Sequence, residues 1–295
     1  MNGDSAPDIL VGPPLDSNNG SESGSATIYS GSDGLAIFNI DGAAAKYALG
    51  MSVGGIDDVD GDQIADFIIG VPFDDSPSAN GGTASVYSGQ TKTVLFTASA
   101  TADEDHLGWS VSSAGDVNGD DVPDFVVGAP EDATFSPKRE GYAKVFSGAT
   151  GGLLFTFDGD ANGDYFGWSV SSAGDVNRDG HDDVIVGADQ FASGPGAGGT
   201  GYARVFSGLD GALLYHLTGD AAGDRFGSAV AGVEDVNGDG FDDFAVGAPR
   251  TQSGTSGYVR VFSGATGAVL HEFVGFGDGD RFGIALAAAG DLDGD

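Results

Sequence analysis

Four aspartate-rich loops hold the residues of this chain best suited to chemistry. They share the pattern D-x-[DN]-x-D-x-x-x-D and begin at Asp58, Asp116, Asp175 and Asp235. Oxygen donors at alternate positions of a tight loop can converge on one cation, with a backbone carbonyl at position seven and an aspartate at position nine. Oxygen ligands in this number suit Ca²⁺, whereas Mg²⁺ prefers a stricter octahedron and zinc prefers nitrogen or sulfur. The sequence therefore predicts four calcium sites.

The predicted ligands occupy positions one, three, five, seven and nine of each loop. They are Asp58, Asp60, Asp62, Ile64, Asp66, Asp116, Asn118, Asp120, Val122, Asp124, Asp175, Asn177, Asp179, His181, Asp183, Asp235, Asn237, Asp239, Phe241 and Asp243. Turn formation alone would explain one such loop, because Asp, Asn and Gly favour turns. Four loops in the same phase favour the metal, because packed carboxylates repel one another without a cation.

An EF-hand does not explain these loops. Its twelfth position supplies a bidentate glutamate. The twelfth positions here are apolar residues of the following strand, namely Ile69, Val127, Val186 and Val246. No helix-like pattern flanks the loops, so we predict calcium sites that join two strands.

The two ends of the chain carry the halves of one more loop. Asp291, Asp293 and Asp295 match its first half and Asp8 matches its last position, while Asp4 would compete with Asp295. A fifth calcium site across the chain ends is therefore possible.

The Asp loops recur in a repeat of about 59 residues, and each period has the same order of elements. A small alternating run such as 166–174 precedes the Asp loop, and a short apolar run such as 125–128 follows it. After a variable loop of about ten residues come an alternating run, 142–148, a turn, and a final run, 153–157. The lengths and β-branched residues predict four strands per period.

This repeat predicts an all-β fold, a β-propeller of four-stranded antiparallel blades. One sheet of this size cannot bury both faces, but radial repetition lets neighbouring sheets cover each other. We expect a single domain over 1–295, with five repeats and one split repeat shared by the first and last blade. Pairing of 282–290 beside 9–12 would close a five-bladed ring and hide two sheet edges. The alternative is part of a larger ring.

Composition restricts the class of partner. The chain has 45 acidic and 11 basic residues, a formal net charge of −34 and no cysteine. Such a charge argues against nucleic acid and against anionic membrane surfaces. The lack of cysteine excludes disulfides and thiolate metal sites. Because no apolar run reaches the length of a membrane span, we predict no direct membrane insertion. The N-terminus does not read as a signal peptide.

Two short motifs recur in phase with the loops and resemble FG-GAP repeats. Phe-Gly occurs at 166–167, 226–227 and 282–283, and Gly-Ala-Pro occurs at 128–130 and 247–249. Variants of these motifs stand in the other periods, such as Leu-Gly at 49–50 and 107–108. FG-GAP repeats form the propellers of integrin α subunits and of many bacterial surface proteins. The resemblance implies an extracellular or cell-surface location, commonly seven blades, structural calcium at one face and ligand binding at the other.

By this resemblance the variable loops 72–81, 130–141, 189–201 and 249–257 are the candidates for ligand binding. The residues in them best suited to contact a ligand are Phe73, Phe135, Lys138, Arg139, Phe191 and Arg250. We predict a binding or adhesion module for a protein or glycan ligand. A structural or assembly unit of a large surface protein is the alternative. A glycosidase or polysaccharide lyase is less supported, because the four histidines fall at unrelated repeat positions. Trp109 and Trp168 occupy equivalent positions, where we expect packing between blades.

Overall fold

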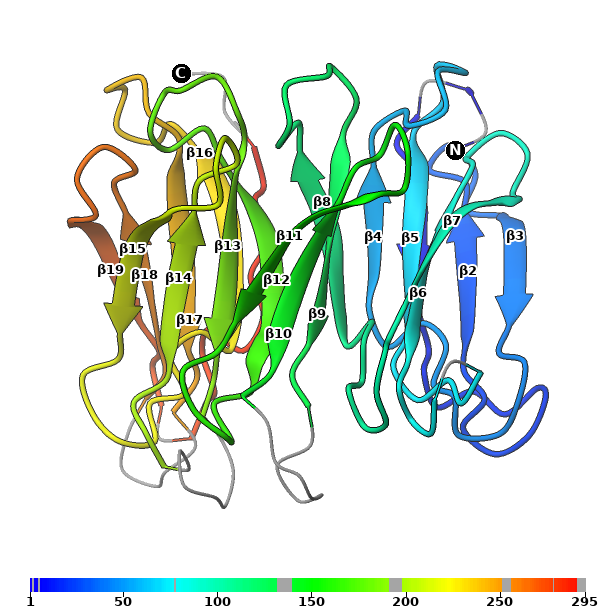
Figure 1. Ribbon diagram of the computed structural model, residues 1–295, viewed down its shortest axis with the longest axis horizontal. Helices are drawn as coiled ribbons and strands as arrows, with labels where there is room; N and C mark the ends of the chain where they lie inside the picture. Colours follow the sequence, from blue (N-terminus) through cyan, green and yellow to red (C-terminus); the bar gives the residue numbers. More distant parts are fainter. Residues whose placement is uncertain are drawn as a thin grey trace.

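A computed structural model describes residues 1, 3–4, 6–76, 78–131, 140–190, 198–250, 256–277 and 279–290. These residues form strands and no helix, and the strands make five antiparallel sheets arranged side by side as blades (Figure 1). The predicted all-β propeller architecture is therefore confirmed. No helix among the described residues has the length and apolar character needed to cross a membrane.

The blades follow one another in chain order. Blade one contains β1 (Ile9–Val11), β2 (Ser25–Tyr29) and β3 (Ala36–Asp41). Blade two contains β4 (Val53–Ile56), β5 (Asp66–Val71), β6 (Thr83–Tyr87) and β7 (Val94–Ser99). Blade three contains β8 (Ser110–Gly115), β9 (Asp124–Ala129), β10 (Tyr142–Phe146) and β11 (Leu153–Asp158). Blade four contains β12 (Phe166–Gly174), β13 (Asp183–Ala188), β14 (Tyr202–Phe206) and β15 (Leu213–Thr218). Blade five contains β16 (Ala229–Glu234), β17 (Asp243–Ala248), β18 (Tyr258–Phe262) and β19 (Val269–Val274).

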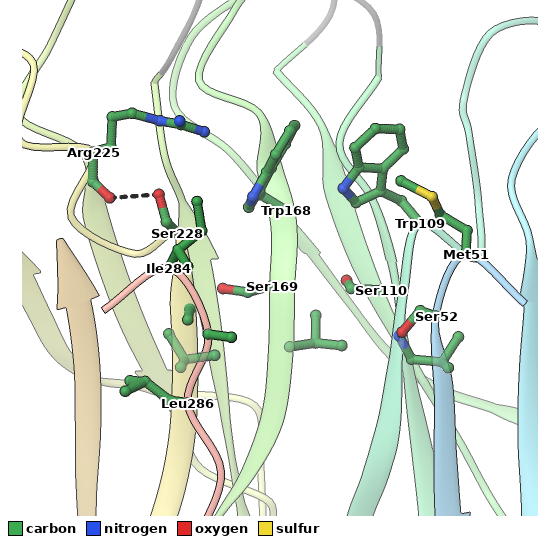
Figure 2. Close-up of a pocket in the computed structure, with 15 residues that line it drawn as sticks. Met51, Ser52, Trp109, Ser110, Trp168, Ser169, Arg225, Ser228, Ile284 and Leu286 are labelled. Carbon is green, nitrogen blue, oxygen red and sulfur yellow. Dashed lines mark hydrogen bonds between the residues drawn. The ribbon is translucent and has the colours of Figure 1, made fainter. Parts of the chain in front are cut away.

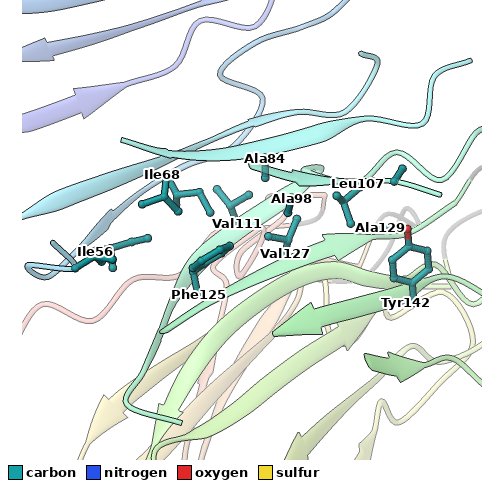
Figure 3. Close-up of a cluster of buried hydrophobic side chains, with 13 residues drawn as sticks. Ile56, Ile68, Ala84, Ala98, Leu107, Val111, Phe125, Val127, Ala129 and Tyr142 are labelled. Atoms are coloured by element: carbon teal, nitrogen blue, oxygen red, sulfur yellow. The ribbon is translucent and has the colours of Figure 1, made fainter. Parts of the chain in front are cut away.

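The core lies in layers between neighbouring blades. One such layer packs Ile68 of β5 and Ala84 of β6 against Val111 of β8 and Phe125 of β9 (Figure 3). Similar clusters lie between the other neighbouring blades. The second strand of each complete blade is buried along almost its whole length, as its β-branched sequence predicts. Neighbouring sheets thus bury the faces that one sheet could not bury alone.

Close backbone contact between blades explains why both recurring motifs contain glycine. A Cβ added at Gly128, in the Gly-Ala-Pro motif of blade three, would lie 2.1 Å from the carbonyl oxygen of Gly167, in the Phe-Gly motif of blade four. Gly187 and Gly227 repeat this contact at 2.1 Å one blade further on. A side chain at these positions would force the blades apart. The two motifs therefore form the joint between successive blades.

The predicted closure of a five-bladed ring is wrong for this structure. Blade one has three strands, and within the described part of the chain β1 pairs with β2 alone. Segment 282–290 forms no strand; instead a Cβ on Gly247 of β17 would lie 2.1 Å from the carbonyl oxygen of Gly283. The Phe-Gly joint therefore holds this segment against blade five, at the other end of the row from β1. The arrangement is open (Figure 1), and part of a larger ring stays a prediction.

Candidate metal loops and axial pocket

The Asp loops and the variable loops lie at opposite ends of the blades. Each Asp loop joins the first strand of a complete blade to the second, as 116–124 does between β8 and β9. The variable loop follows the second strand, and antiparallel pairing therefore puts it at the other end. The repeat thus gathers four similar carboxylate loops at one end of the molecule.

Loop 58–66 brings three carboxylates together. Ligand oxygens of Asp58, Asp60 and Asp66 all lie within 4.8 Å of one another. The backbone N–H groups of 61–63 donate to the Asp58 carboxylate at 2.6–3.0 Å and fold the loop around it. Asp62 accepts the N–H of Ile64 at 2.8 Å. These oxygens converge as the ligands of one cation would.

The aspartate at position nine is fully buried in all four loops. The Asp124 carboxylate accepts the N–H groups of Val117, at 3.0 Å, and Gly148, at 2.8 Å, and thereby ties its loop to the end of β10. Burial raises the pKa of Asp124 to about 6 and that of Asp183, which accepts the N–H groups of Val176 and Gly208, to about 7, against the lowering effect of the backbone hydrogen bonds. Nearby aspartates of the same loops raise the pKa further. Burial likewise raises the pKa of Asp66 and Asp243. A nearby cation would oppose this effect.

The carbonyl oxygens at position seven are open to a ligand. Among the described residues, no hydrogen bond reaches the carbonyl oxygen of Ile64, Val122, His181 or Phe241. The His181 ring instead lies with Nδ1 3.0 Å from the carbonyl oxygen of Val117 in the preceding blade. A backbone carbonyl beside three or four carboxylate or amide oxygens is a donor set that fits Ca²⁺.

Position three distinguishes the first loop from the others. Asn118 donates through Nδ2 to the Asp124 carboxylate at 3.2 Å, and Asn237 contacts Asp243 in the same way at 3.2 Å. Asp60 stands at this position in loop 58–66, where no donor replaces the amide. Two carboxylates therefore face each other in this loop, where loops 116–124 and 235–243 pair an amide with a carboxylate.

We expect the effect of Asp60→Asn on stability to be opposite with and without calcium. In chelator the amide should hydrogen-bond to Asp66 and remove a charge repulsion, which raises stability by about 1 kcal/mol. With calcium present the variant loses one charged ligand, and that site should bind more weakly. Thermal melts with and without calcium test this, and Asp75→Asn in an exposed loop at the opposite end is the control. Destabilisation in both conditions would contradict the prediction.

Neighbouring Asp loops are connected through the aspartate at position eight. The N–H of Asp116 donates to the Asp182 carboxylate at 2.8 Å, and the N–H of Asp182 donates back to the Asp116 carbonyl at 3.0 Å. Asp175 and Asp242 repeat the first contact at 2.9 Å. Position eight is alanine or proline in the first two loops, so this clamp joins only the last three. The backbone at position one of a loop is therefore held by the neighbouring loop.

Of the four residues of the predicted fifth site, Asp8 alone belongs to the described part of the chain. The Asp8 carboxylate takes the place of position nine in blade one, because it accepts the N–H of Gly31 at 3.1 Å. It also lies 3.0 Å from the N-terminal ammonium of Met1. Asp291, Asp293 and Asp295 lie outside the described residues. The fifth site stays a prediction.

Two of the predicted ligand-contact residues lie in the described part of the variable-loop end. Phe73 packs edge-on against His106, with ring centroids 5.0 Å apart, and against Trp109 at 6.3 Å. Arg250 forms an ion pair with Asp224, with Nε 2.9 Å from Oδ1, and lies over the Tyr258 ring. Both side chains therefore have internal partners. Phe135, Lys138, Arg139 and Phe191 lie outside the described residues.

A pocket of about 490 Å³ lies among the first strands of blades two to five, at their variable-loop end. It is lined by the start of the first strand of blades two to five and by 284–286 (Figure 2). Trp109 and Trp168 stand at its mouth with ring centroids 4.9 Å apart. They contact each other across two blades, as the packing prediction requires, but they also face this pocket.

Sequence reasoning missed a buried aspartate that stands two residues before each Phe-Gly or Leu-Gly pair of blades three to five. Its carboxylate accepts the hydroxyl of the tyrosine that opens the third strand, at 2.9–3.0 Å. The pairs are Asp105 with Tyr142, Asp164 with Tyr202, and Asp224 with Tyr258. Burial and the carboxylate raise the pKa of Tyr202 and Tyr258. The common repeat phase of aspartate and tyrosine was the signal that could have identified this clamp.

Comparison with known proteins agrees with the repeat and the fold. FG-GAP repeats match residues 107–146, 166–206 and 226–262. Integrin alpha-5 of Xenopus laevis is 35% identical over 179 residues, which cover 58% of this chain and 16% of that protein. Integrin alpha-V of Gallus gallus is 34% identical over 179 residues, with the same coverage. Integrin alpha-PS2 of Drosophila melanogaster is 31% identical over 207 residues, or 64% of this chain and 14% of that protein.

The matched segments, the blades and the glycine joints together define a β-propeller of FG-GAP repeats. Within that class the chain is integrin α-like. The chain spans about one sixth of the length of the integrin subunits that it matches.

Proposed function

We propose that this chain is a calcium-stabilised extracellular binding module that attaches to a protein or glycan at the cell surface. The observation that carries the proposal is the division of each complete blade into a repeated Asp loop at one end and a loop of variable length at the other. A rigid scaffold with variable loops at one face is a common arrangement for recognition. Similarity to integrin α subunits supports an adhesive role and a surface location.

We assign the four calcium ions to positions one, three, five, seven and nine of the four Asp loops. The converging oxygens of Asp58, Asp60 and Asp66 support this assignment, as do the buried carboxylates at position nine. Bound calcium would supply the positive charge that these carboxylates lack. The ions would stabilise the blades and take no part in a reaction, and we propose no catalytic role for the chain.

Binding of the fluorescently labelled chain to cell surfaces tests this function. We expect binding in calcium, little binding in chelator, and loss of binding when 190–199 of a variable loop is replaced by a glycine–serine sequence. Protease and glycosidase treatment of the cells separates a protein ligand from a glycan ligand. Nucleic acid should not compete, given the net charge of −34.

The matched control changes exposed residues at the Asp-loop end. Ala149→Ser with Thr150→Ala alters the exposed turn between β10 and β11 and should leave binding unchanged. If the variant with the replaced loop keeps its melting temperature and still binds fully, recognition does not use that loop. Absence of calcium-dependent binding to any cell surface would overturn the proposed function.

A further inference from the structure

We propose that the pocket behind Trp109 and Trp168 binds a neutral saccharide. The inference rests on the proposed function, since it gives the binding end of the propeller a location and a ligand class. Four kinds of observation support it: the aromatic mouth, the free indole N–H groups, the hydroxyl-bearing walls and the charge of the lining.

The mouth of the pocket offers aromatic surface held in place by neighbours. The Trp109 and Trp168 rings adjoin each other, with centroids 4.9 Å apart and planes at 46°, so they form two angled aromatic walls instead of one flat stack. Tyr165 braces Trp168 edge-on at 6.1 Å, and Phe73 braces Trp109 at 6.3 Å. The apolar faces of a sugar ring pack against such walls, and fixed walls lose little side-chain entropy on binding.

The same rings present polar groups to the pocket. Neither indole N–H has a hydrogen-bond acceptor among the described residues. Figure 2 shows the nitrogen of each ring at the end nearer Ser110 and Ser169. The hydroxyls of these serines donate to the carbonyl oxygens of Gly167 and Gly227, at 2.8 Å each, which leaves their oxygens able to accept. Donors and acceptors therefore alternate with apolar surface, and this suits a polyhydroxylated ligand better than an apolar side chain.

The charge of the lining favours a neutral ligand. None of the residues that line the pocket is acidic, and the one charged residue is Arg225. Its guanidinium lies over Trp168 and is paired with the buried Asp189, with Nη2 2.5 Å from Oδ2. A cationic ligand would be repelled by this guanidinium, and the lining offers no carboxylate to pair with it. An anionic ligand would be repelled by a chain of net charge −34.

The chain contains only two tryptophans, and both stand in this pocket, so intrinsic fluorescence reports on it directly. The experiment titrates the calcium-loaded full chain with glucose, galactose, mannose, N-acetylglucosamine and their β-linked disaccharides. We expect a saturable change in tryptophan emission with at least one neutral sugar, and protection of both rings from iodide quenching. Calorimetry then gives the affinity of each variant. Trp168→Phe keeps the aromatic wall and loses the N–H, so it should bind about fivefold more weakly, roughly the effect of one hydrogen bond.

Three results distinguish this inference from its rivals. Trp109→Ala should weaken binding at least about tenfold, since it removes a wall as well as a donor, whereas Phe273→Ala on β19, an exposed aromatic outside the pocket, should bind as the parent does. No response to any sugar in the panel would overturn the proposal. A response only to an aliphatic alcohol or to arginine amide would also overturn it, in favour of an apolar or cationic side chain of a protein. Calcium-dependent cell binding would survive these failures, so they leave the proposed function standing.

Discussion

Removal of calcium should lower the melting temperature of this chain by roughly 20 °C. At a free calcium concentration about one hundred times the dissociation constant, each site adds about 2.7 kcal/mol to the free energy of unfolding. Four independent sites would add about 11 kcal/mol, which is comparable with the whole stability of a typical domain. The large effect follows from the repeat, because every complete blade has its own Asp loop.

Differential scanning calorimetry in calcium, in magnesium and in chelator measures this effect, and a calcium titration counts the ions. We expect four bound ions and a much smaller shift in magnesium, which tolerates irregular oxygen geometry poorly. Five ions would indicate that the split loop at the chain ends also binds. An unchanged melting temperature in chelator, with no ion bound, would mean that the Asp loops serve only as turns.

Without calcium, the protein should become less stable as the pH rises from about 4 to about 7. The reason is the buried aspartate at position nine, whose pKa in the folded state is about 6 for Asp124 and about 7 for Asp183. A carboxyl with a raised folded pKa binds its proton more tightly in the folded state than in the unfolded state. The contribution of such a carboxyl to the free energy of unfolding is therefore complete below 3.8, its pKa in the unfolded chain. It is lost as the pH rises through the pKa in the folded state.

The expected loss is large because one pKa unit corresponds to about 1.4 kcal/mol. Ionisation of Asp124 and Asp183 together should lower the free energy of unfolding by roughly 3–6 kcal/mol between pH 4 and pH 7, or the melting temperature by about 6–12 °C. Asp160 and Asp220 work in the opposite direction, because hydrogen bonds from Arg204 and Arg260 lower their pKa. Their contribution to stability is lost only in acid, as the pH falls below the pKa of these groups in the unfolded chain. This loss sets the lower limit of the pH range in which stability declines with rising pH.

Melts in chelator across this pH range, repeated with saturating calcium, test the prediction. Calcium should abolish the decline, because the ion stabilises the ionised carboxylates. The control is Asp103→Asn, which changes an exposed aspartate at the opposite end and should leave the slope unchanged. A melting temperature in chelator that rises between pH 4 and pH 7 would contradict the assignment of buried, uncompensated carboxylates.

The sequence determined the parts of this protein that depend on local chemistry and on repetition. Runs that alternate between apolar and polar residues, and short apolar runs, predicted the strands. Side chains of a strand alternate between its two faces, and a strand buried on both faces is apolar throughout. The phase of the Asp loops located the carboxylates, and the convergence of Asp58, Asp60 and Asp66 agrees with that pattern, because a tight loop brings alternate positions together. Phe-Gly and Gly-Ala-Pro marked the blades, and the structure gives the reason in the 2.1 Å approach of Gly128 to the next blade.

Only the tertiary structure decided how these parts meet. Closure of the ring depends on the angle between successive blades, which no local pattern encodes, and segment 282–290 packs on blade five instead of on β1. The clamp from Asp182 to Asp116 joins residues 66 positions apart. The pocket behind Trp109 and Trp168 arises because equivalent positions of neighbouring repeats lie side by side along the first strands of the blades. Contacts between repeats depend on how whole sheets pack, whereas the strands and loops depend on their own residues.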